Sequence, residues 1–310
     1  MDLWLDTDPG FDDWMAWLLI ESLPQFRLHG VSVVAGNAPL AITQPNALRI
    51  KAFHGFETPV YTGCDRPLAQ PQVTAQDVLG LHGMETTGAA LPEVQATLAR
   101  GHGALALIDA VRAMPGQITL LAVGPLTNIA TAFLLAPELP GLLKQIVIMG
   151  GSTVGGNATA AAEFNIYADP EAAAQVFACG VSVAMFGLNV CRQVPVTTEH
   201  VAQVRRVGGV QAQVFADYLD AYVDISRKRG RAFQSVYDPT PVMWLARPEL
   251  FELRRARVDI ELAGRHTRGM TVCDLRAPAL ARANAQVAIS AQGEVALPWA
   301  LAQIEARLRR

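Results

Sequence analysis

Short apolar segments alternate with longer segments of mixed polarity from the N-terminus to about residue 185. Short strands separated by helices of about ten residues are typical of βαβ units, so this pattern predicts a mostly parallel sheet with helices on both faces. The predicted strands are 2–6, 28–35, 59–61, 118–123, 145–149 and 181–185. The predicted helices are 11–23, 41–53, 103–113, 125–134 and 170–178. The sequence therefore predicts a doubly wound α/β fold with a Rossmann-like core.

The C-terminal part of the chain gives a weaker pattern. Residues 196–231 are predicted to form helices of mixed charge. Residues 258–262 and 287–291 are interpreted as late strands, for which an antiparallel orientation is considered. We find no internal repeat and no long Ser/Gly-rich linker. Because a chain of this length can bury about 75% of its unfolded surface, one domain spanning residues 1–310 is the preferred interpretation.

Composition excludes several classes of protein. With 51% hydrophobic and 17% charged residues the chain is not a disordered polymer, and a net charge of −3 gives no electrostatic reason to expect nucleic acid as a partner. The four cysteines show no CxxC spacing, as expected for buried thiols in a reducing compartment. There is no secretory signal pattern and no apolar run long enough for a bilayer, so we expect a cytoplasmic protein without membrane contact.

The acidic residues are unevenly distributed. Asp6, Asp8, Asp12 and Asp13 lie within eight residues, around a Pro-Gly turn between a strand and a helix. Helix capping explains one or two of these carboxylates, but three or four close together are costly unless a cation neutralises them. Oxygen ligands without a nearby His or Cys favour Ca²⁺ or Mg²⁺. Because such an ion can orient and acidify a water molecule, hydrolysis is the chemistry we expect.

Polar residues also follow several other predicted strands, at 36–37, 124–128, 150–151 and 187–189. Ligands of open α/β sheets bind at the carboxyl ends of the strands, so the active site is expected there. Within residues 156–171, Asn157, Glu163 and Asn165 suit sugar hydroxyls and Phe164 can form an apolar wall. The alternative is an ordinary loop that leads into a helix. Asp238, before a proline, is by itself no more than a helix cap.

Six blocks along nearly the whole chain resemble the inosine-uridine preferring nucleoside hydrolase family. They are DTDPGFDD at 6–13, VVAGN at 33–37, AVGPLTNIA at 122–130, IVIMGG at 146–151, GNATAAAEFNIYADPEAA at 156–173 and RGMTVCDLR at 268–276. The first looks like the N-terminal signature of that family. The resemblance implies hydrolysis of the N-glycosidic bond of ribonucleosides and a homodimer or homotetramer.

The resemblance also implies roles for individual residues. Ca²⁺ would be bound by the carboxylates of Asp8, Asp13 and Asp238 and by the backbone carbonyl of Val123. Asp8 would also be the general base for the calcium-bound water. The ribose-binding residues implied are Asp12, Asn37 and Asn165 for the 2′ and 3′ hydroxyls, Asn157 and Glu163 for the 5′ hydroxyl, and Met149 against the sugar ring. His82 and Phe164 would lie near the base.

The sequence departs from the family pattern where the leaving base should be protonated. The residue before the calcium-binding Asp238 is His in familiar members, but here it is Tyr237. A phenol is protonated at neutral pH but is not readily recharged like an imidazole. We therefore expect an altered base preference or rate, with Tyr237 and His82 as the candidate acids. Further candidate base contacts are Tyr222, Arg229 and Gln234, each of which can equally be a residue of a solvated helix.

Two other functions remain open from the sequence. Asp6 and Asp8 superficially resemble the DxD nucleophile of haloacid-dehalogenase-type phosphohydrolases, although the following residues fit that class poorly. A catalytically weak nucleoside- or sugar-binding protein is the second alternative, to which Tyr237 gives some support.

Overall fold

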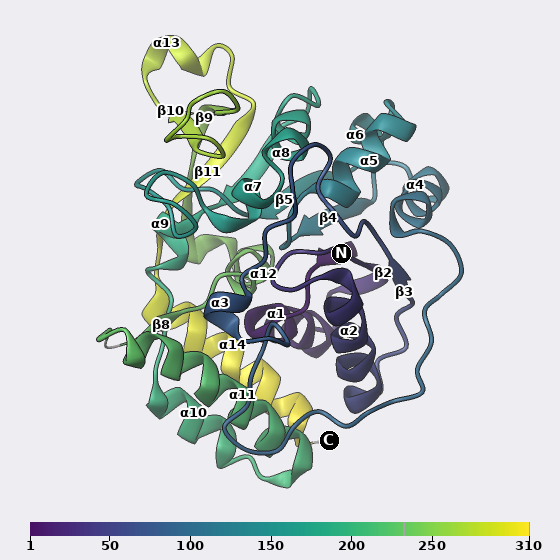
Figure 1. Ribbon diagram of the computed structural model, residues 1–310, viewed down its shortest axis with the longest axis vertical. Helices are drawn as coiled ribbons and strands as arrows, with labels where there is room; N and C mark the ends of the chain where they lie inside the picture. The colour runs from purple at the N-terminus through teal and green to yellow at the C-terminus, as the bar shows by residue number, and fades with distance from the viewer. Residues whose placement is uncertain (232, 310) are drawn as a thin grey trace.

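A nine-stranded sheet forms the centre of the computed structural model, which describes residues 1–231 and 233–309. The strand order is β10-β9-β11-β6-β5-β4-β1-β2-β3 (Figure 1). The strands are β1 (Asp2–Thr7), β2 (Arg27–Val33), β3 (Val60–Thr62), β4 (Ile118–Ala122), β5 (Gln145–Met149), β6 (Val183–Phe186), β9 (Phe251–Ile260), β10 (Thr271–Asp274) and β11 (Ala285–Ala291). All neighbouring pairs are parallel except β9 with β10 and with β11. The predicted doubly wound, mostly parallel sheet is confirmed.

Helices cover both faces of this sheet. The longer ones are α1 (Phe11–Ser22), α2 (Leu40–His54), α4 (Gly103–Ala113), α5 (Thr127–Leu135), α8 (Pro170–Phe177), α10 (Thr198–Arg205), α11 (Gly209–Lys228), α12 (Pro239–Ala246) and α14 (Gly293–Leu308). The short elements are α3 (Gln76–Leu79), α6 (Leu139–Leu142), α7 (Phe164–Ala168), α9 (Leu188–Cys191), α13 (Ala277–Leu280), the 3₁₀ turn Pro248–Leu250, and the two-stranded pair β7 (Pro195–Val196) and β8 (Gln234–Ser235).

Alternation along β1 divides the core into two layers. Leu3 and Leu5 pack in the layer that contains α1, α11, α12 and α14, whereas Trp4 points into the layer of α4, α5 and α8. Figure 1 shows these two helix groups on either side of the strands. Because the central strands are buried on both faces, they appear in the sequence as nearly continuous apolar runs. Helix α1 is apolar on almost every side, since it lies between the sheet and helices α12 and α14.

The C-terminal third differs from the prediction. The strands expected at 258–262 and 287–291 belong to β9, which begins at Phe251, and to β11, and the two are antiparallel to each other as considered. The N-terminal part of β11 is in addition parallel to β6. Strand β10 and helix α14 were not predicted. Pro298 lies inside α14, and proline is disfavoured in a helix interior, yet the helix is stabilised by burial against α1 and α11. Among the described residues, no helix is both long and apolar enough to cross a membrane.

The buried His54 of α2 forms a hydrogen bond with Trp14 of α1. The indole Nε1 of Trp14 donates to Nε2 of His54 at 2.9 Å, so this nitrogen must be unprotonated. Nδ1 of His54 lies 3.3 Å from Oε1 of Gln211, and the ring packs against Phe53 and Phe56. Burial lowers the pKa of His54 to about 4. The imidazole is therefore neutral in the folded protein at neutral pH.

We expect His54 to make the protein sensitive to mild acid. Because the folded pKa lies below the unfolded value of 6.5, the contribution of His54 is fully present above pH 6.5 and is lost as the pH falls toward about 4. Between pH 7 and pH 5 this amounts to about 2 kcal/mol of unfolding free energy. Urea unfolding of the wild type and of His54→Gln at both pH values measures it. Equal losses of unfolding free energy in the two proteins would contradict the assignment.

Candidate functional site

A cavity of about 480 Å³ opens at the carboxyl ends of β1, β4 and β5. Strand order reverses between β1 and β4, and this switch point is where open α/β sheets bind their ligands. Val123 and Met149, at the ends of β4 and β5, form part of the floor. Of the site residues predicted from the sequence, all except Asp8, Asp13 and His82 line the cavity. The structure thus brings together residues from six separate segments of the chain.

The turn between β1 and α1 is held by Asp13. Its Oδ1 accepts hydrogen bonds from the Thr7 hydroxyl and from the backbone N of Asp8 at 3.2 Å. Its Oδ2 accepts from the backbone N of Gly10 and from Nδ2 of Asn37, both at 2.9 Å. Because both oxygens are fixed by neighbouring donors, the Asp13 carboxylate has one defined orientation at the base of the site.

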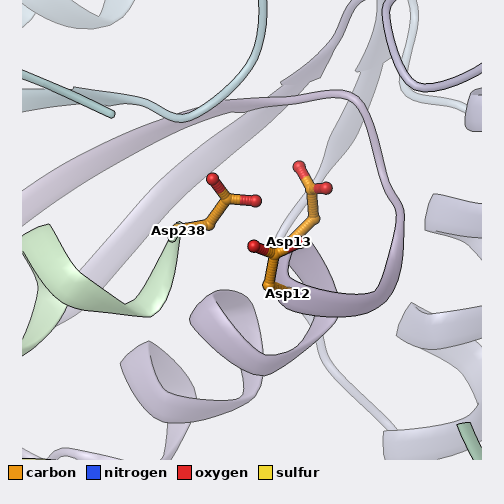
Figure 2. A group of neighbouring side chains, drawn as sticks. All are labelled: Asp12, Asp13 and Asp238. Atoms are coloured by element: carbon orange, nitrogen blue, oxygen red, sulfur yellow. The ribbon is translucent and has the colours of Figure 1, made fainter. Parts of the chain in front are cut away.

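Three carboxylates converge beside this turn. Oxygen atoms of Asp12, Asp13 and Asp238 all lie within 4.8 Å of one another. Figure 2 shows Asp12 and Asp13 rising from the first turn of α1, while the Asp238 carboxylate extends toward them from the start of α12. Helices α1 and α12 pack directly against each other, which places residues 225 positions apart in the sequence side by side.

Asp8 occupies a narrow slot behind these three residues. Its side chain is buried, and Oδ2 accepts a hydrogen bond from the backbone N of Asn37 at 2.7 Å. A Cβ atom on Gly36 would lie 2.1 Å from Oδ2 of Asp8, and one on Gly124 would lie 2.6 Å from Oδ1. Only glycine at these two positions leaves room for the carboxylate.

Burial and mutual repulsion raise the pKa values of this acidic group. The pKa values of Asp8 and Asp238 lie well above the usual range, mainly through burial and then through the charges of neighbouring aspartates. Burial, followed by the charge of Asp13, raises the pKa of Asp12 to about 7. No Arg, Lys or His within residues 1–231 and 233–309 makes an ion pair with any of these carboxylates. An all-oxygen cluster lacking a protein counter-charge fits a hard divalent cation.

Asn165 and Asp12, which both line the cavity, are each held in place by hydrogen bonds. Nδ2 of Asn165 donates to the carbonyl oxygens of Val123 at 2.7 Å and Met149 at 3.1 Å. Oδ2 of Asp12 accepts from the Tyr222 hydroxyl at 3.0 Å and from the backbone N of Tyr237 at 3.2 Å. Tyr222 is 2% exposed, so it is a buried residue that orients Asp12 and does not belong to a solvated helix face.

The segment before α7 is an organised part of the site. Glu163 is buried, and its carboxylate accepts hydrogen bonds from the backbone N of Gly151 at 2.8 Å and of Asn165 at 2.9 Å. Burial raises the pKa of Glu163 to about 7. Oδ1 of Asn157 accepts from the backbone N of Phe164 at 2.9 Å. These contacts make Glu163 the N-cap of α7 and fix the order of the segment beside the cavity that it lines, and its role in binding a sugar stays a prediction.

The remaining wall of the cavity is built from α9, α11 and β8. Tyr237 lies there, and burial followed by the charge of Asp12 raises its pKa to about 12. Arg229 and Gln234, considered as base contacts from the sequence, do line the cavity. Arg192 also lines it, and sequence reasoning missed this residue because an arginine after a four-residue helix carries no pattern of its own.

His82 lies outside the cavity lining. It belongs to the turn between Gly80 and Gly83, its side chain is exposed, and its backbone carbonyl accepts from Nδ2 of Asn46 at 2.9 Å. The geometry therefore gives no contact that supports the predicted place of His82 near the base, and that role stays a prediction.

Asp6 also points away from the cavity. It is fully buried, and its Oδ2 accepts hydrogen bonds from the Ser32 hydroxyl and from Nδ2 of Asn128 at 2.8 Å. A nucleophile for phosphoryl transfer must reach its substrate, so the DxD phosphohydrolase alternative does not fit this geometry. The contacts instead give Asp6 a supporting position between β1, β2 and α5.

Comparisons with known proteins match the chain over nearly its whole length. The model of the family described as "Inosine-uridine preferring nucleoside hydrolase" matches residues 3–297. The pyrimidine-specific ribonucleoside hydrolase RihA of Shewanella woodyi is 39% identical over 286 residues, 91% of either chain. The pyrimidine-specific RihB of Escherichia coli O9:H4 is 34% identical over 271 residues, 87% of this chain and 86% of that one. A purine-preferring ribonucleoside hydrolase structure from Gardnerella vaginalis superposes with a TM-score of 0.92 at 27% identity, covering 100% of this chain and 99% of that one.

Proposed function

The chain belongs to the inosine-uridine preferring nucleoside hydrolase family, and from that premise we propose that it hydrolyses the N-glycosidic bond of ribonucleosides to ribose and free base with Ca²⁺ as cofactor. The observation that carries this proposal is the convergence of Asp12, Asp13 and Asp238 beside a cavity that Glu163 and Asn157 also line. The three carboxylates provide a site for a cation, and the same cavity is lined by groups that can form hydrogen bonds with a ribose.

Four groups of the protein would hold the ion. These are the carboxylates of Asp8, Asp13 and Asp238 and the carbonyl of Val123. That carbonyl accepts one hydrogen bond from Asn165 and retains a second lone pair. When bound, the ion supplies positive charge that neutralises the buried carboxylates and favours a hydroxide-like nucleophile.

The side chains of this protein perform the remaining tasks. Asp12 and Asn165, supported by Asn37, would bind the 2′ and 3′ hydroxyls, and Glu163 with Asn157 would bind the 5′ hydroxyl. Met149 would pack on the ribose, and Phe164 would lie at the base side. Asp8 would accept the proton of the attacking water, because its carboxylate would lie beside the ion that holds that water.

The preferred base is the least constrained part of the proposal. The relatives named above include pyrimidine-specific and purine-preferring hydrolases. Tyr237 replaces the expected acid, and its pKa of about 12 makes the phenol a hydrogen-bond donor at neutral pH and a poor proton donor. We propose that Tyr237 shifts base preference or rate while ribose binding is retained.

A panel of purine and pyrimidine ribonucleosides, assayed by release of reducing sugar in Ca²⁺ buffer, tests the function directly. We expect ribose from at least one nucleoside, and a base profile that changes in Tyr237→Phe. Binding of nucleosides without ribose release across the panel would favour the alternative of a catalytically weak binding protein. An inosine and uridine profile unaffected by Tyr237→Phe would refute the role given to this residue.

We further propose that the chain is a single nucleoside hydrolase domain, 1–310, acting in the cytoplasm on free nucleosides as a homodimer or homotetramer. The shared sheet and the two continuous core layers support the single domain. Light scattering of the purified protein would determine the assembly.

A further inference from the structure

Cleavage of an N-glycosidic bond leaves the bonding electron pair on the departing base, and this inference about how that charge is stabilised rests on the proposed function. A general acid can cancel the charge by protonation, and a fixed positive charge can stabilise it without transferring a proton. Tyr237 carries a phenol, which is not readily recharged with a proton between turnovers as an imidazole is. A positively charged side chain at the base end of the cavity would stabilise the departing base without giving up a proton.

The charges around the cavity are divided between its walls. The ribose end carries Asp12, Asp238 and Glu163, whereas the wall formed by α9, α11 and β8 carries Arg192, Arg229 and Arg231. The facing segment, residues 73–79, contributes a single acid to the lining, at position 77. The lining apart from the assigned ribose groups therefore contains three arginines and one acid among apolar and neutral residues.

Arg192 is the best placed of these three residues. It follows α9 directly, and its Nη2 donates to the carbonyl oxygen of Gly156 at 3.3 Å, next to Asn157. Arg192 lines the main cavity and the adjoining one together with Tyr237. Within the described residues it forms no ion pair with a carboxylate, so its positive charge is not already neutralised.

We propose that Arg192 is a catalytic residue that stabilises the departing base as an anion. The C–N bond breaks with both electrons going to the base nitrogen, and water adds to the anomeric carbon while Asp8 takes its proton. The base anion is then protonated by solvent after release, and Asp8 returns its proton to solvent. The guanidinium gives up no proton, so the step needs no recharging of an acid at position 237.

The test varies the leaving group. Steady-state kcat/KM is measured for the best ribonucleoside of the panel and for p-nitrophenyl ribofuranoside, whose leaving group is already stable as an anion. We expect Arg192→Gln to lower kcat/KM for the nucleoside by about 30-fold and for the nitrophenyl riboside by less than about 3-fold. Arg192→Lys, which keeps the charge, should restore part of the nucleoside rate. Arg206→Gln, an exposed arginine outside the cavity lining, is the matched control.

The possible outcomes separate the two proposals. A wild type that releases ribose from neither substrate refutes the proposed function itself. A wild type that cleaves both, with Arg192→Gln reducing both to the same extent or neither, overturns the role of Arg192 and leaves nucleoside hydrolysis standing. A loss confined to the nucleoside supports the inference.

Discussion

Replacing Asp8 by asparagine is expected to lower ribose release from the best nucleoside substrate by about a thousand-fold at saturating Ca²⁺. The amide is nearly the size of the carboxylate, so it fits the slot beside Gly36 and Gly124 and can still accept from the backbone N of Asn37. It cannot take a proton from water, and it removes one negative charge from the cluster. The fold should therefore survive while turnover is lost.

Two measurements distinguish these effects of Asp8→Asn. Initial rates report turnover, and isothermal titration of the metal-free protein reports the Ca²⁺ affinity, which should fall as well. Asp109→Asn serves as the control, because Asp109 is an exposed residue of α4 far from the cavity lining. Activity of Asp8→Asn within about 3-fold of the wild type would eliminate Asp8 as general base.

The second large expected effect is on the stability of Asp238→Asn relative to the wild type, and the sign of this difference depends on whether Ca²⁺ is present. In a chelating buffer Asp238→Asn should raise the melting temperature by several degrees, because it removes a buried charge repelled by Asp12, Asp13 and Asp8. With free Ca²⁺ at about 100 times its dissociation constant, the wild type should gain about 2.7 kcal/mol, and the variant should gain little.

The pH dependence of the chelated proteins gives an independent check. The folded pKa of Asp238 lies above its unfolded value of 3.8, so its penalty is fully present above the folded pKa and disappears as the pH falls toward 3.8. The advantage of Asp238→Asn should therefore shrink on acidification, as scanning calorimetry can show. If Ca²⁺ stabilises the wild type and Asp238→Asn equally, Asp238 is not a ligand.

Much of the fold was predictable because the central strands are buried on both faces. The apolar runs at β4 and β5 have few alternatives to a parallel strand, and their bounds match the predicted ones closely. The partly exposed β9 and the proline-containing α14 lack that signal. Their structure depends on the neighbours against which they pack, which periodicity does not reveal.

The candidate site was likewise predictable from the sequence only in part. Its acidic turn and the segment from Asn157 to Asn165 are continuous in sequence, so their chemistry is visible in the residue order. Tyr222 and Arg192 act on the site from α11 and from the end of α9, and only the three-dimensional structure brings them to the cavity. Tyr222 is a candidate base contact from the sequence, but its burial and its bond to Asp12 are not predictable from a single tyrosine on a helix. No local pattern singles out Arg192.

The slot around Asp8 has a consequence for how this sequence can change. Gly36 and Gly124 carry no functional group, yet even the smallest added side chain at either position would displace the carboxylate between them. Substitution there should therefore resemble loss of Asp8 itself. The identity of residues 36 and 124 is therefore restricted by the space that the Asp8 carboxylate needs, although neither glycine takes part in the chemistry.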